Sequence, residues 1–198
     1  MSLPPGLPLR LRARFTVTRC GTRVLRALGL REPVIRWRGA VLRARRNLFE
    51  RLGSARYSRP ALHEMDRKLD EIIDRDGGFF VEAGGADGFT QSNTYYLERF
   101  RGWRDHRRGR VPARALSDLL DEENPARLDL LSLDVEGFEE QVLRGLDLFR
   151  HAPDWILIEM HDLPAGRRQI GGLLGDRYVE HALLSPLDVL YRRVGSVH

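Results

Sequence analysis

Three short apolar segments constrain the fold of this 198-residue chain most: FFVEA at 79–83, LDLLSLDV at 128–135 and WILIEM at 155–160. Their apolar character is nearly continuous, which is typical of strands buried on both faces of a sheet. Segments with helical apolar spacing lie around them, at 60–73, 92–100, 115–123 and 137–149. Strands that alternate with helices predict an α/β domain with a mostly parallel sheet and helices on both faces.

The order of these elements predicts where a ligand would bind. In parallel α/β sheets, ligands bind beyond the carboxyl ends of the strands. This rule brings together the loop after Glu82, the acids after Leu133 and the residues after Ile158. Two further strands, at 178–185 and 187–193, are expected to close the domain.

The charge of the chain is divided unevenly. Residues 1–56 hold 14 arginines against two glutamates, a net charge of +12, whereas residues 57–198 carry a net charge of −7. We therefore predict a basic N-terminal arm over 1–56, partly helical or disordered, and a folded domain over 57–198. Within the arm, the Pro- and Gly-punctuated residues 3–39 predict irregular structure. The apolar spacing of 40–52 predicts a helix.

The arm admits three interpretations: a solvated surface, an organelle transit peptide, or a peripheral contact with an anionic membrane surface. It carries few aromatic residues and no nucleic-acid-binding motif, so we expect no nucleic-acid partner. Cys20 is the single cysteine, which excludes a disulfide within one chain and a cysteine-based metal site. No apolar run approaches the ~20 residues of a membrane span. We expect a cytoplasmic location.

The segment EAGGADG, residues 82–88, is a glycine-rich loop directly after the first strand. It lacks the Gly-Lys-Ser/Thr of a phosphate-binding P-loop, and its glycines do not match the spacing of the dinucleotide fingerprint. It resembles the acid-x-Gly-x-Gly-x-Gly loop of Rossmann-like S-adenosylmethionine-dependent methyltransferases, with Ala86 in place of the middle glycine. Glycines let the backbone approach a ligand closely, and the start of the next helix offers N–H groups.

Several segments together resemble the FkbM-type methyltransferase family: FFVEAGGADGFTQSNTYYLERFRGW, VPARALSDLLDEENPARLDLLSLDVEGFEEQVLRGLDLF, PDWILIEMHD and LDVLYRR. The resemblance implies a Rossmann-like fold and S-adenosylmethionine-dependent O-methylation of a small-molecule or glycan acceptor, such as a sugar or secondary metabolite. The expected cofactor-binding residues are Glu82, Gly84, Gly85, Asp87, Gly88, Ser92 and Asn93.

Removal of the hydroxyl proton during O-methylation needs a general base. We predict Asp134, Glu136 and His161 as catalytic residues, and Glu159 is a further candidate. Each has an alternative structural role: Asp134 and Glu136 are also suited to the start of a helix, where negative charge is favourable. Asp134 and Glu136 are too few to predict a metal site, so we predict none.

The chain departs from the family pattern after Trp103. Only residues 104–110 separate Trp103 from Val111, where the family has further strands, so we expect the second and third strands to be missing. Asp105 lies 17 positions after Gly88, near the spacing of a ribose-binding acid, but no apolar strand precedes it. An uncovered first strand would favour self-association unless the arm covers it. Two alternatives follow: a catalytically impaired, methyltransferase-like binding protein without the ribose half of the cofactor site, or a gene model that lacks a segment.

Overall fold

The computed structural model describes residues 31–85, 88–105 and 114–195, with side chains from residue 40 onward. The chain divides into two compact units, Met1–Ser54 and Ala55–His198. In the first unit, α2 spans Arg31–Arg51. The expectation of irregular structure is wrong for residues 31–39, which are helical. Pro33 is compatible with this because it lies in the first turn, where its missing N–H breaks no helical hydrogen bond.

The second unit contains a six-stranded sheet in the order β2-β1-β3-β4-β6-β5. The strands are β1 (Phe79–Ala83), β2 (Arg104–Asp105), β3 (Leu130–Leu133), β4 (Trp155–Glu159), β5 (Tyr178–Leu183) and β6 (Asp188–Arg193). The first four strands in sequence run parallel, and β6 is antiparallel to both β4 and β5. The predicted α/β fold with a mostly parallel sheet is therefore confirmed.

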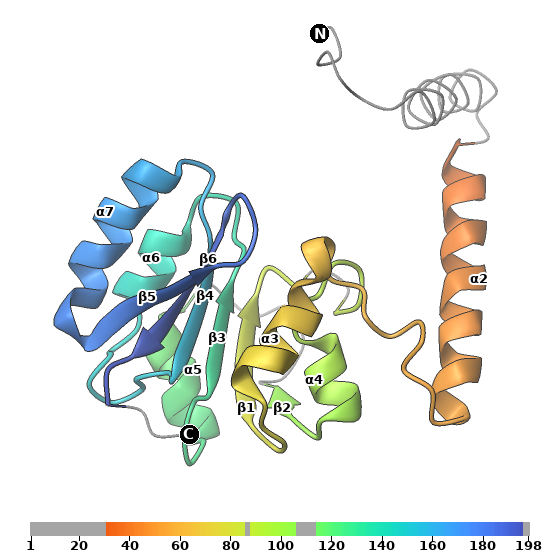
Figure 1. Cartoon of the computed structure of the whole chain (residues 1–198), viewed down its shortest axis with the longest axis horizontal. Helices are drawn as coiled ribbons and strands as arrows, with labels where there is room; N and C mark the ends of the chain where they lie inside the picture. The colour runs from red at the N-terminus through yellow and green to blue at the C-terminus, as the bar shows by residue number, and fades with distance from the viewer. Residues whose placement is uncertain (1–30, 86–87, 106–113, 196–198) are drawn as a thin grey trace, which may run out of the picture. The chain divides into compact units, whose positions relative to one another are not determined.

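Helices cover both faces of this sheet (Figure 1). They are η1 (Leu62–Glu64), α3 (Met65–Ile73), α4 (Tyr95–Phe100), α5 (Leu116–Glu123), α6 (Glu139–Arg144), α7 (Leu163–Leu174) and η2 (Gly175–Arg177). On one face, α3 and α4 pack on Phe80, Leu130 and Leu157. On the other face, α5, α6 and α7 pack on Val81, Leu131 and Ile156. The alternation of adjacent residues between two cores explains why these strands are apolar throughout.

The second strand, expected to be missing, is present as a two-residue strand. In β2, Arg104 and Asp105 pair in parallel with Phe79 and Phe80 of β1. The buried ring of Trp103 anchors β2, because its Nε1 donates to the carbonyl oxygen of Arg75 at 2.8 Å. No third strand continues the sheet beyond β2 within the described residues.

Helix α6 is shorter than the predicted segment 137–149. It ends at Gly145, whose carbonyl oxygen accepts from the N–H of Ser117 at 3.0 Å. A hydrogen bond from the start of α5 thus takes the place of the next hydrogen bond within α6, which a longer helix would have formed. Phe138 precedes α6 and Phe149 follows its end, so neither lies on the helix, and the two side chains are 64% and 83% exposed.

Candidate active site

The glycine-rich loop leaves the carboxyl end of β1 in tight contact with the end of β3. Gly84 has φ of +103°, and a Cβ at this position would lie 1.7 Å from the carbonyl oxygen of Asp134. The N–H of Asp134 donates to the carbonyl oxygen of Ala83 at 3.0 Å. Only glycine fits position 84, because any side chain would overlap the backbone of the neighbouring strand. Gly84 and Asp134, two predicted site residues far apart in sequence, are therefore adjacent.

The Glu82 carboxylate holds the segment before α4. Its oxygens accept from Ser92 Oγ at 2.7 Å, from the N–H of Asn93 at 2.7 Å and from Thr94 Oγ1 at 2.8 Å. Asn93 Nδ2 also donates to Ser132 Oγ on β3, at 3.3 Å. Glu82 therefore positions Ser92 and Asn93 beside the strand ends, whether or not it also contacts a ligand.

The expectation that the start of this helix offers free N–H groups is wrong for the residues around Ser92. The N–H of Asn93 is bonded to Glu82, and those of Thr94 and Tyr95 donate to Ser92 Oγ at 3.3 and 3.1 Å. The helix itself begins later than predicted, at Tyr95, and has only six residues. The predicted site residue Asp87 lies outside the described residues. Gly85 and Gly88 lie on the loop, where the N–H of Gly88 donates to the carbonyl oxygen of Gly85.

Four polar residues at the ends of β3 and β4 form what we call the edge group: Asp134, Glu136, Glu159 and His161. His161 Nε2 lies 3.5 Å from Glu136 Oε2, and His161 Nδ1 lies 3.9 Å from Glu159 Oε2. Asp134 and Glu159 share a hydrogen bond. The three predicted catalytic residues are thus brought together, and Glu159 lies between Asp134 and His161.

The environment of Glu159 favours its protonated form. Its pKa is raised from 4.5 to about 7, mainly by burial and then by the hydrogen bond and negative charge of Asp134. Asp188 adds a smaller effect of the same sign, and the charge of His161 opposes it. Because Asp134 and Glu159 interact closely, the proton belongs to the pair as much as to either residue. A carboxyl group that titrates near neutral pH is suited to acid–base chemistry.

Sequence reasoning missed Asp188 at this edge. Asp188 begins β6, and because β6 is antiparallel its first residue lies level with Glu159, the last residue of β4. Burial raises the pKa of Asp188, which accepts a short hydrogen bond from Ser185 Oγ. The signal was available in the pattern, since an antiparallel closing strand starts at the edge where parallel strands end.

A cavity of about 350 Å³ opens beside the edge group. It lies between the end of β4 and the helices α6 and α7, and its walls include Glu139, Gln141, Glu159, His161 and Gln169. Carboxylates and amides can hydrogen-bond hydroxyl groups. Within the described ranges, no three His, Cys, Asp or Glu side chains are arranged to hold a metal ion.

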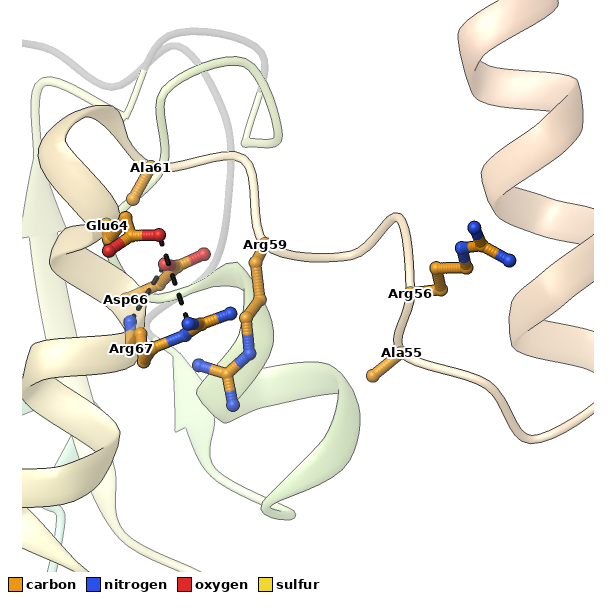
Figure 2. Close-up of a pocket in the computed structure, with 7 residues that line it drawn as sticks. All are labelled: Ala55, Arg56, Arg59, Ala61, Glu64, Asp66 and Arg67. Atoms are coloured by element: carbon orange, nitrogen blue, oxygen red, sulfur yellow. Dashed lines mark hydrogen bonds and ion pairs between the residues drawn. The ribbon is translucent and has the colours of Figure 1, made fainter.

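A second cavity, of about 480 Å³, lies at the start of α3. Figure 2 shows Glu64, Asp66 and Arg67 at this helix start and Arg59 on the loop that leads into it. Burial raises the pKa of Asp66, and its Oδ1 accepts from the N–H of Arg67 at 2.8 Å. None of the predicted site residues lines this cavity, so we give it no role in catalysis.

A Rossmann-like sheet with a glycine-rich loop after β1, and with acidic groups at the carboxyl ends of β3 and β4, is typical of α/β enzymes that bind a ligand at this edge. The family model for the methyltransferase FkbM domain matches residues 31–189, which is 159 of the 198 residues. The chain belongs to the FkbM methyltransferase family, as its motifs predicted, and it is a methyltransferase that depends on a methyl-donor cofactor. Searches of curated proteins and of solved structures gave no match. Across the described residues, no helix has both the length and the apolar character needed to span a bilayer.

Proposed function

We propose that the protein transfers a methyl group from S-adenosylmethionine to a hydroxyl group of a sugar, glycan or secondary metabolite. The observation that carries the proposal is the contact between the glycine-rich loop at Gly84 and the backbone of Asp134. Through this contact the glycine-rich loop lies directly beside Asp134, whose neighbour Glu159 has a pKa raised to about 7. Methyl transfer to oxygen needs such a neighbourhood, because the acceptor oxygen, the methyl carbon and the cofactor sulfur must be held in line while a base lies beside the acceptor hydroxyl.

The residues of the loop fit the methionine end of the cofactor. Gly84, Gly85 and Gly88 put no side chains beyond the end of β1. A carboxylate has about four acceptor sites. Three donors from the protein leave Glu82 one site for an ammonium group. When bound, S-adenosylmethionine supplies a methyl group on a positively charged sulfur, and the acidic edge group favours positive charge nearby.

The residues around Asp105 fit the ribose less well. Asp105 is paired with Phe80, three residues before the end of β1 at Ala83, so it lies about 10 Å short of the glycine-rich loop at ~3.3 Å per residue. Asp105 is therefore not assigned to the ribose.

We assign the proton transfer to the Asp134–Glu159 pair. Above about pH 7 Glu159 is ionised, and the pair can then accept the proton of an acceptor hydroxyl. His161 lies 3.9 Å from Glu159 and is half exposed, so it can pass this proton to solvent. The acceptor would enter through the cavity between α6 and α7, whose wall includes both Glu159 and His161.

Calorimetric titration of the full chain with S-adenosylmethionine tests the cofactor assignment. We expect saturable heat and a higher melting temperature, because a ligand that binds only the folded state stabilises it. The absence of heat and of a thermal shift at about millimolar cofactor, the upper end of ordinary KM values, would refute the assignment. That result would instead favour the catalytically impaired binding protein.

The acceptor is tested by incubating the protein and cofactor with sugars and other hydroxyl compounds and following the mass gain of one methyl group. Glu159→Gln should abolish the rise of activity with pH while still binding the cofactor. If cofactor binds and yet carboxylic acids or amines are methylated in place of hydroxyl compounds, the O-methylation of hydroxyls is wrong.

A further inference from the structure

Helix α2 exposes a row of large apolar side chains. Val41, Leu42, Leu48 and the neighbouring Leu52 are between 45% and 72% exposed. Val41, Leu48 and Leu52 are separated by seven and four residues, which places them on one face of a helix, and Leu42 lies at the margin of that face. Together these four residues are called the apolar face of α2.

The same helix is strongly basic. Between residues 40 and 54, Arg43, Arg45, Arg46 and Arg51 stand against one acid, Glu50. Arg46 and Glu50 form an ion pair at 3.7 Å, and their spacing from Val41 puts them on the opposite side of the helix. The net charge of residues 40–54 is therefore +3, within an arm whose net charge is +12 over residues 1–56.

Three partners could cover an apolar, cationic helix face, and the residues favour one of them. RNA would neutralise the arginines, but its phosphates would leave the apolar face exposed to water. A second copy of α2 would cover the apolar face but would bring two sets of arginines together. An anionic lipid surface suits both the apolar face and the positive charge of α2, since acyl chains cover the leucines and headgroups pair with the arginines.

We propose that α2 binds peripherally to anionic membranes, lying in the plane of the bilayer surface with its apolar face in the headgroup–acyl boundary. A helix of 21 residues is about 31 Å long at 1.5 Å per residue, enough to present several turns to the surface. This inference does not rest on the proposed catalytic activity, because none of the α2 residues that carry it is assigned to the cofactor or to proton transfer.

Sedimentation of the full chain with vesicles tests the proposal. The vesicles contain phosphatidylcholine alone or with about 30% phosphatidylglycerol, near the anionic content at which surface potentials attract basic segments. One double variant, Leu42→Gln/Leu48→Gln, removes apolar surface and keeps the charge. A second double variant, Arg43→Gln/Arg51→Gln, removes positive charge and keeps the apolar surface. The control, Val179→Gln/Leu183→Gln, changes two residues on β5 that are 47% and 48% exposed, like Val41 and Leu42.

We expect the wild type and the β5 control to bind the anionic vesicles equally and the neutral vesicles weakly. Both α2 variants should bind the anionic vesicles about tenfold more weakly or worse, since each leucine and each arginine contributes. If the wild type binds neutral and anionic vesicles equally well, the proposed attraction between the arginines and anionic headgroups is refuted. If the leucine variant binds vesicles as the wild type does, the proposal is overturned; RNA binding lost only with the arginine variant, or dimers lost only with the leucine variant, would then identify the partner.

Discussion

The pKa of Glu159 offers a quantitative test of the edge group through the variant Glu159→Gln. The pKa rises from 4.5 to about 7, and each unit of difference is worth about 1.4 kcal/mol, which corresponds to about 3 kcal/mol. The Glu159 side chain is 22% exposed, so solvent screening reduces this to about 2 kcal/mol. That amount is a large part of the stability of a domain of this size.

The sign follows from proton binding. Between about pH 4.5 and pH 7 the folded protein keeps a proton on Glu159 that the unfolded chain has released. The stability from this group is therefore fully present below pH 4.5 and is lost as the pH rises through about 7. Glutamine has no such proton, so Glu159→Gln should gain about 2 kcal/mol relative to the wild type between pH 4.5 and pH 8.

Urea unfolding of both proteins across this pH range measures the difference. Glu71→Gln, at an exposed position on α3, is the matched control and should leave the pH dependence unchanged. Parallel stability curves for the wild type and Glu159→Gln would show that Glu159 is ionised throughout, and the acid–base role of the pair would be wrong. In a methylation assay the same variant should lower kcat by about 10²–10⁴ and remove the rise with pH near 7.

Three further changes test the parts of the structure that position the site. Gly84→Ala should cost at least about 3 kcal/mol in urea unfolding, from positive φ and overlap with Asp134, whereas Gly171→Ala, within α7 and with open space around it, should stabilise slightly. Glu82→Gln should lower stability by about 1–2 kcal/mol, because three donors lose a charged acceptor; an unchanged melting temperature would contradict this. Asp129→Asn should lower the free energy of unfolding by about 3 kcal/mol, since the buried Asp129 accepts from Arg75 and from the N–H of Phe79. A smaller loss of stability than that caused by Glu140→Gln, which breaks the exposed Glu140–Arg144 pair, would refute this prediction.

Strand positions and the glycine-rich loop could be read directly from the sequence. FFVEA and WILIEM correspond to β1 and β4 because burial on two faces requires apolar residues in succession, a local signal. The rule that the carboxyl ends of parallel strands meet at one edge of the sheet correctly grouped Asp134 with Glu159 and His161. The extent of α6 could not be read in this way, since hydrogen bonds from α5 end it at Gly145.

By itself, the sequence determined the α/β class, the positions of the main strands along the chain, the methyltransferase family and most of the residues that meet at the carboxyl edge. Only the tertiary structure decided that Arg104 and Asp105 form a strand, that Asp188 joins the edge, and that Glu82 is already bonded to Ser92, Asn93 and Thr94. The physical reason is the sequence distance over which each feature is set. Apolar periodicity reports burial of nearby residues, whereas a two-residue strand, a raised carboxyl pKa and a carboxylate that accepts from three protein donors depend on partners brought together by the fold.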